Sequence, residues 1–205
     1  KNGSYGKLMK AYYAKQDAEK LSGKGDTSQK LTLMKTSADS LKKSADALND
    51  SSLWEKKKIK KKDEKTGEEI AVEDYDWDKI TKAVKSFVED YNDVVKEAGE
   101  SNTKDVLRNA SWMTGMTDKN SNMLAKIGIT IGKGNKLELD EDALKQADIS
   151  SLKTVFTGYN SFVSKISQKA TGISNAANRA SATYTNNGTY SKTDSSLTSS
   201  KIDKE

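Results

Sequence analysis

Two acidic clusters contain the residues of this sequence that are best suited to chemistry. One consists of Asp140, Glu141 and Asp142, and the other of four acidic residues between positions 73 and 78. Carboxylates bind calcium, but neither cluster has the ligand spacing of an EF-hand loop. Both clusters directly precede segments of helical pattern, where carboxylates cap the helix and complement its dipole. The spacing favours helix capping, and we expect no metal site and no cofactor.

Composition argues against catalysis. Histidine and cysteine are absent, so the commonest general base, the usual zinc ligand and thiolate ligands are all missing. Gly128, Gly132 and Gly134 do not follow a phosphate-loop pattern and instead indicate the turn of a hairpin. A glycosidase or peptidoglycan hydrolase would need a carboxylate pair about 5–9.5 Å apart in a cleft. No local pattern indicates such a pair, and we predict that the chain has no catalytic residue.

The charges of the chain are nearly balanced. Thirty-five basic and 30 acidic residues give a net charge of +5. The basic run from Lys56 to Lys62 contains no aromatic residue and is followed at once by the acidic stretch 63–78, so it predicts a solvated hairpin and no nucleic-acid partner. No apolar stretch reaches the roughly 18 residues of a membrane span, and no cleaved signal peptide is recognisable.

Four segments place their apolar residues with helical periodicity. We expect helices at about 6–21, from Thr27 or Ser28 to about 53, from Asp76–Asp78 to about 98, and from Ser150 or Ser151 to about 180. The stretch 22–26 contains two glycines and predicts a flexible break. Proline is absent, which permits long helices.

Three of these segments repeat their apolar residues at alternating spacings of three and four, which is a heptad pattern. Heptads in several segments of one chain predict an antiparallel bundle or coiled coil. We expect Tyr159 on the same face of the last helix, and three tryptophans, Trp54, Trp77 and Trp112, to anchor the helix ends. The predicted bundle and assembly seam consists of Leu31, Met34, Leu41, Leu48, Ile80, Val84, Phe87, Tyr91, Val94, Leu152, Val155, Phe162 and Ile166.

The remaining pattern completes a mainly α fold class. Mean hydropathy is −0.83, which favours an elongated bundle with a narrow core over a wide one. Alternation and turn residues predict two small β-hairpins, at about 56–75 and 127–139. A short amphipathic helix at about 104–116 is expected to decorate the bundle. We therefore predict one helical domain over 1–183 and a disordered tail over 184–205, which has hardly any apolar residue.

Two motifs resemble those of a known family. The first is Leu124-Ala-Lys-Ile-Gly-Ile-Thr-Ile131, followed by Gly134-Asn-Lys-Leu-Glu-Leu-Asp-Glu-Asp-Ala-Leu144. The second, upstream, is Phe87-Val-Glu-Asp-Tyr-Asn-Asp-Val94. Their order and spacing resemble the C-terminal axial region of the flagellar filament cap family, hook-associated protein 2, over about residues 77–182.

This resemblance implies a structural protein of the bacterial flagellum. Its members are exported without a cleaved signal peptide, associate with copies of themselves and with flagellin or other axial subunits, and promote or terminate flagellin assembly outside the cell. Full members carry large β-rich head domains, whereas only the hairpin at 56–75 separates the second and third helices here. The alternatives are a flagellin-like protein and a secreted adhesin that reuses the axial fold.

Overall fold

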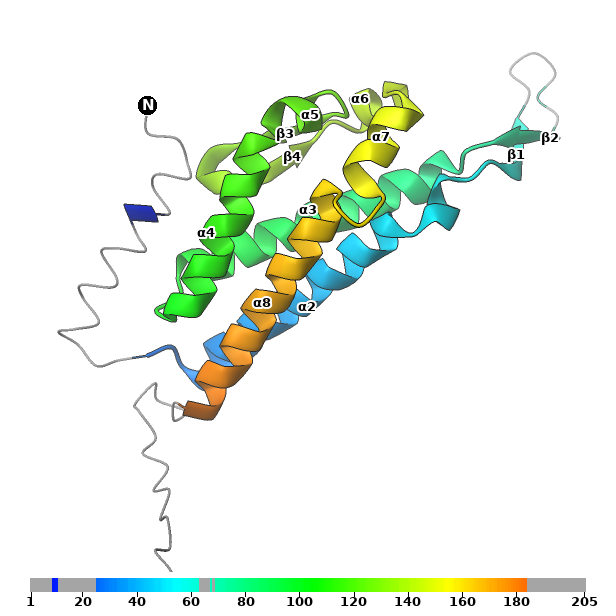
Figure 1. Cartoon of the computed structure of the whole chain (residues 1–205). Coiled ribbons are helices and arrows are strands. Elements are labelled where there is room, and N and C mark those ends of the chain that lie inside the picture. Colours follow the sequence, from blue (N-terminus) through cyan, green and yellow to red (C-terminus); the bar gives the residue numbers. More distant parts are fainter. Residues whose placement is uncertain (1–8, 11–24, 63–66, 68, 184–205) are drawn as a thin grey trace, which may run out of the picture.

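The computed structural model describes residues 9–10, 25–62, 67 and 69–183 (Figure 1). The helix expected at 6–21 falls within this range only at Met9 and Lys10, which are helical, and the tail at 184–205 lies outside it. The described helices are α2 (Ser28–Asn49), α3 (Trp77–Gly99), α4 (Lys104–Lys119), α5 (Ser121–Ala125), α6 (Glu141–Gln146), α7 (Ile149–Phe156) and α8 (Phe162–Thr183). The described strands are β1 (Lys57–Lys62), β2 (Glu69–Asp74), β3 (Ile129–Ile131) and β4 (Leu137–Leu139).

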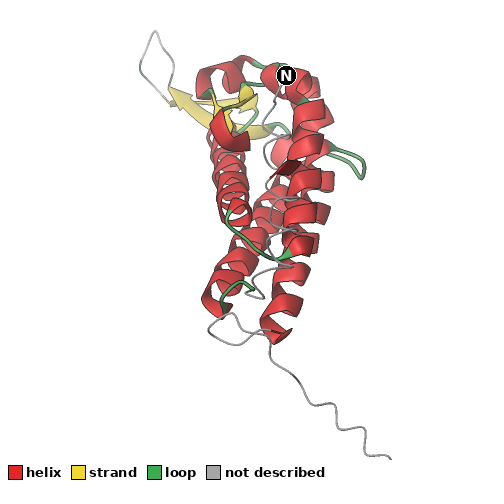
Figure 2. Cartoon of the chain, turned by 90° about the vertical axis from the view of Figure 1, so that its left-hand side faces the viewer, coloured by secondary structure: helices red, strands yellow, loops and turns green. Residues whose placement is uncertain are grey.

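The long helices form an elongated bundle, which confirms the mainly α fold class. Helix α2 packs against α8 and α3, and α4 packs against α8 and α3. Figure 1 and Figure 2 show these helices running alongside one another. The β1–β2 hairpin joins α2 to α3 and extends beyond the end of the bundle (Figure 1). Helices α2 and α8 run antiparallel, since Asp39 contacts Ser174 and Asp46 contacts Ser167.

Helices α2 and α3 begin where their capping residues predict. The Thr27 side chain accepts a hydrogen bond from Lys30 N at 3.3 Å, and the Asp76 carboxylate accepts one from Lys79 N at 3.2 Å. Each cap satisfies a backbone N–H that the first turn leaves without a partner. The buried face of α2 is its heptad seam, with Leu31, Met34, Ala38, Leu41, Ala45 and Leu48.

The single helix predicted from Ser150 to about 180 is wrong. The chain leaves the helix after Phe156, passes through Gly158 at φ +98°, and enters α8 at Phe162. Phe156 stacks on Trp54 with ring centroids 5.4 Å apart, and Gly158 N donates to Asn49 Oδ1 at 2.8 Å. Docking on the end of α2 thus interrupts the helix, and Tyr159, expected on the seam, is 82% exposed.

The helix predicted at about 104–116 is present as α4, which extends to Lys119. Its predicted role as a decoration is wrong, because it packs along α8 as a member of the bundle, with Val106, Ala110 and Met113 buried. Its Trp112 is 62% exposed, against the expectation that all three tryptophans anchor helix ends. Trp54 does anchor one: it is buried, and its Nε1 donates to Leu48 O at 2.8 Å.

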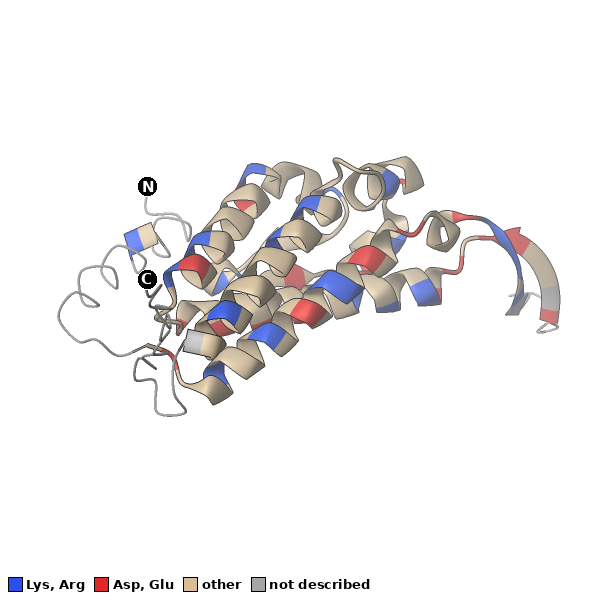
Figure 3. Cartoon of the chain, turned by 60° about the horizontal axis from the view of Figure 1, so that its bottom comes forward, with Lys and Arg blue, Asp and Glu red and all other residues tan. Residues whose placement is uncertain are grey.

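Both predicted hairpins are present. In the first, β1 pairs antiparallel with β2, and Lys57, Lys58 and Lys62 lie opposite acidic residues. Lys60 Nζ lies 3.1 Å from Glu69 Oε2, and Figure 3 shows the basic strand beside the more acidic one. In the second, β3 pairs with β4 around a helical turn at Lys133–Asn135. The Lys-rich strand is therefore neutralised locally by its own hairpin partner.

Gly128 lies between α5 and β3, packs against the first turn of α6, and should not tolerate a side chain. Its φ is +79°, and a Cβ atom there would lie 2.6 Å from Asp140 O and 2.9 Å from Leu144 N. We expect Gly128→Ala to lower the free energy of unfolding by about 1–3 kcal/mol. A positive φ strains alanine, and the backbone atoms of Asp140 and Leu144 cannot move away from the new Cβ atom. Urea denaturation measures the change.

Gly132→Ala is the matched control. The three atoms nearest to a Cβ atom at Gly132 would all belong to the side chain of Glu138, which is exposed and can move aside. The φ of Gly132 is −87°. Equal losses in the two variants would contradict the strain predicted at Gly128.

Candidate assembly site

The thirteen residues of the predicted seam lie together in the core of one chain. Their side chains belong to a single buried cluster, and the most exposed of them, Phe162, is only 3% exposed. Helices of the same chain cover them. Contacts with another subunit of this folded domain must therefore use other faces of the helices.

An aromatic group lies at the centre of this core. The Phe87 ring is 6.3 Å from the Tyr91 ring and 6.3 Å from the Phe162 ring, with the second pair edge to face. Tyr91 is fully buried, and its hydroxyl donates to Thr117 Oγ1 at 2.8 Å. Burial raises the pKa of Tyr91 well above its ordinary value. The phenol is thus a neutral hydrogen-bond donor that ties α3 to α4.

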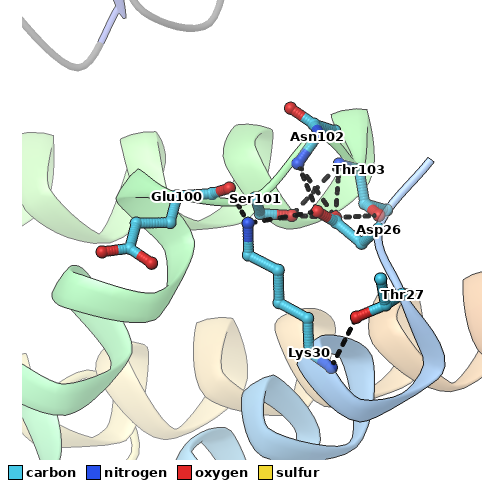
Figure 4. A network of polar contacts seen from close by, with 7 residues as sticks. All are labelled: Asp26, Thr27, Lys30, Glu100, Ser101, Asn102 and Thr103. Atoms are coloured by element: carbon cyan, nitrogen blue, oxygen red, sulfur yellow. Dashed lines mark hydrogen bonds and ion pairs between the residues drawn. The ribbon is translucent and has the colours of Figure 1, made fainter. Parts of the chain in front are cut away.

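A buried carboxylate that the sequence did not reveal holds the start of α2 against the turn between α3 and α4. Asp26, predicted to lie in a flexible break, is only 2% exposed. It accepts hydrogen bonds from Ser101 Oγ at 2.6 Å, Asn102 N at 2.9 Å and Thr103 Oγ1 at 2.7 Å (Figure 4). Lys30 Nζ lies 3.6 Å from the same carboxylate and donates to Glu100 O.

These contacts set the charge of Asp26. Burial by itself raises the pKa of this carboxyl, but the hydrogen bonds from Ser101, Asn102 and Thr103, together with Lys30, outweigh burial and hold the pKa below its ordinary 3.8. The carboxylate is ionised and fully engaged, so it has a structural role. Its partners are about 75 residues away in the sequence, and a lone Asp-Thr pair before a helix indicates only a cap.

Two further aspartates join α2 to α8. Asp39 accepts a hydrogen bond from Ser174 Oγ at 2.6 Å, and Asp46 accepts one from Ser167 Oγ at 2.7 Å. Both carboxylates also pair with a lysine four residues earlier on α2. Asp46 follows Asp39 by seven residues on α2, and Ser174 follows Ser167 by seven residues on α8. The two hydrogen bonds are therefore one heptad apart and lie beside the apolar seam.

A groove runs between α2 and α3 on the surface that the other long helices leave uncovered. Its volume is about 400 Å³. Its lining combines small side chains, exposed lysines and a half-buried aspartate. The lining residues are Ser40, Lys43, Ser44, Ala47, Lys79, Lys82, Ala83, Ser86 and Asp90.

Helix α4 carries a second uncovered face. Trp112 is exposed beside a hollow of about 360 Å³ that Gly115, Met116 and Lys119 also line. Lys169 Nζ of α8 lies 5.1 Å from the centre of a Trp112 ring. A cation over an aromatic face stabilises modestly at an exposed site, so this contact orders the indole without burying it.

The acidic clusters act as helix caps, as their positions predicted. Asp140 accepts hydrogen bonds from Asp142 N at 3.0 Å and Ala143 N at 2.9 Å at the start of α6. In the part of the chain that the structure describes, no three acidic residues gather closely enough to hold a metal ion. Among the same residues, no helix is both long enough and apolar enough to cross a membrane.

Comparison with known proteins gives one match. A family model for the C-terminus of flagellar hook-associated protein 2 matches residues 101–205, just over half of the chain. Within the described residues the match contains α4 to α8 and the β3–β4 hairpin, while α2, α3 and the β1–β2 hairpin precede it. No curated protein and no solved structure gives a significant match.

Proposed function

The chain belongs to the flagellar hook-associated protein 2 family through that family's C-terminal region, and we propose that it is a cap-type axial subunit that assembles at the tip of the flagellar filament. The family is one of structural flagellar proteins. The proposal rests on the family match, because the matched residues contain the whole β3–β4 hairpin and the helices that pack against α2 and α3.

The proposed role is to associate with copies of itself and with flagellin or other axial subunits, and thereby to promote or terminate flagellin assembly. The architecture supports it because an elongated antiparallel bundle presents long helix faces to neighbours. Two such faces, the α2–α3 groove and the α4 surface at Trp112, remain uncovered by described residues. The thirteen seam residues stabilise the rod and position both faces.

The subunit is proposed to act outside the cell after export without a cleaved signal peptide. The β1–β2 hairpin occupies the connection between α2 and α3, where full family members carry head domains. It projects from the end of the bundle (Figure 1). The proposed cap therefore contacts flagellin mainly through helix faces and this hairpin.

Gold-labelled antibody against the chain tests the proposal on isolated flagella viewed by electron microscopy. We expect label confined to filament tips. We also expect a strain that lacks the chain to release flagellin monomers into the medium, and the wild-type chain to restore filaments. A strain that lacks flagellin serves as the control for antibody specificity.

Two other results would overturn capping. Label along the whole filament would identify a flagellin-like subunit. Label absent from flagella, together with binding of the purified chain to host surfaces, would identify a secreted adhesin.

A further inference from the structure

We propose that the groove between α2 and α3 binds an acidic amphipathic helix of a neighbouring axial subunit. This inference rests on the proposed function, which supplies the neighbour, and it assigns the contact to one surface. The groove is separate from the buried seam, although it is built by the same two helices.

The spacing of the lining residues is that of a helix-packing face. On α2 the groove is lined at positions 40, 43, 44 and 47, and on α3 at 79, 82, 83, 86 and 90. Steps of three and four keep these residues on one side of each helix. Helix α2 thus has two faces with heptad spacing, one that packs in the core and one that lines the groove.

More than half of the residues that line the groove have small side chains. These are Ser40, Ser44 and Ala47 on α2, and Ala83 and Ser86 on α3. Small residues leave room for the ridge of a third helix at the usual axial separation of about 8–10 Å. The α3 side, from Lys79 to Asp90, extends for about 16 Å. A docked segment of three to four turns would fill the groove.

The exposed lysines that line the groove favour an acidic binding partner. Lys43, Lys79 and Lys82 flank the small residues, and Asp90 is the one acidic residue of the lining. Lys79 pairs with Asp76 at 3.3 Å, whereas no described acidic residue lies within 4 Å of Lys43 or Lys82 in an ion pair. An incoming helix with acidic residues beside its apolar stripe complements these lysines. A second copy of the same groove would bring lysine against lysine.

An exposed leucine extends the same face. Leu33 precedes Ser40 by seven residues, which places it on the same side of α2, and it is 50% exposed. Asp90 lies at the same end of the groove, where its carboxylate accepts a hydrogen bond from Ser44 of α2. This end of the face therefore combines an apolar contact at Leu33 with a polar group at Asp90.

Photo-crosslinking to the full chain tests the inference. The probes are two synthetic helical peptides of four turns, both with an alanine and photo-leucine stripe; one has glutamates on its flanks and the other lysines. We expect the glutamate peptide to bind more tightly, to lose affinity with added salt, and to cross-link to residues of the groove, as mapped by mass spectrometry.

Charge reversal and filling of the groove make the test specific. The double variant Lys43→Glu/Lys82→Glu is expected to bind the glutamate peptide about ten-fold more weakly and to bind the lysine peptide more tightly. Ala47→Trp, at an exposed position, should block both peptides. The matched control Lys153→Glu/Lys165→Glu, which makes the same charge change at exposed sites on α7 and α8, should bind as wild type.

Several outcomes would overturn the inference. They are equal affinity for the two peptides, cross-links outside the groove, no cross-link at all, and no effect of Ala47→Trp. The antibody labelling of filament tips is measured separately. Label at the tips without peptide binding would contradict this inference alone. Peptide binding without label at the tips would contradict the proposed function instead.

Discussion

Replacement of Phe87 by alanine is expected to lower the free energy of unfolding by about 3–5 kcal/mol. Phe87 is fully buried between Tyr91 and Phe162, with both ring centroids 6.3 Å away. Its removal takes apolar contacts from α3 and α8 at once and leaves a cavity that a packed bundle fills only in part. Urea denaturation followed by circular dichroism at 222 nm measures the loss.

Tyr159→Ala is the matched control for Phe87. The tyrosine is also aromatic and shares the heptad spacing of the last segment, but it is 82% exposed. We expect its replacement to change the free energy of unfolding by at most about 0.5 kcal/mol. If the two variants unfolded at the same urea concentration, the assignment of Phe87 to the core would be wrong.

Replacement of Asp26 by alanine is expected to cost about 3 kcal/mol. The carboxylate satisfies donors on Ser101, Asn102 and Thr103, which are partly or fully buried. Its loss leaves these donors without their partner and frees the segment before α2 from the α3–α4 turn. Hydrogen exchange of the amides of Asn102 and Thr103 would report the local opening directly.

The same residue predicts a loss of stability in acid. Because the folded pKa of Asp26 lies below the ordinary 3.8, the unfolded chain takes up a proton more readily. The stabilisation from Asp26 is therefore present above about pH 4 and is lost as pH falls through the folded pKa. Asp39 and Asp46 act in the same direction, since hydrogen bonds and lysines outweigh the effect of burial on their pKa values.

Asp90 acts in the opposite direction. Burial raises its pKa despite a hydrogen bond from Ser44, and the nearby Asp93 and Glu89 add to the rise. Its contribution to stability is present in acid and is lost as pH increases through the folded pKa.

Urea denaturation from pH 3 to pH 7 tests the prediction for Asp26. As the pH falls, the free energy of unfolding should decrease less for Asp26→Asn than for wild type. Identical pH profiles would show that the network does not set the charge of Asp26.

Much of the fold follows from local pattern. The heptads of α2 and α3, their caps at Thr27 and Asp76, and the β3–β4 hairpin all depend on neighbours within a few turns. Local pattern also carried the family resemblance, since the motif from Leu124 to Leu144 lies within the matched residues. These features depend on propensity and periodicity, which a sequence displays directly.

The break between α7 and α8 could not be predicted in this way. The apolar spacing continues through Thr157–Ser161, so periodicity alone indicates one helix. Docking of Phe156 on Trp54 and of Gly158 on Asn49, about 100 residues away, decides where the helix stops. The same holds for α4, whose apolar side is covered by the distant α8.

The helical class, the heptad positions and the family resemblance are all encoded in the order of neighbouring residues and could be predicted from it. Which helix faces stay open depends on the packing of distant segments. That packing buried the whole predicted seam, anchored Asp26, exposed Trp112 and brought Ser44 to Asp90 beside a groove. Burial and charge pairing depend on which distant helices pack together. Heptad spacing predicts that a helix has a packing face, but it does not predict which helix covers that face.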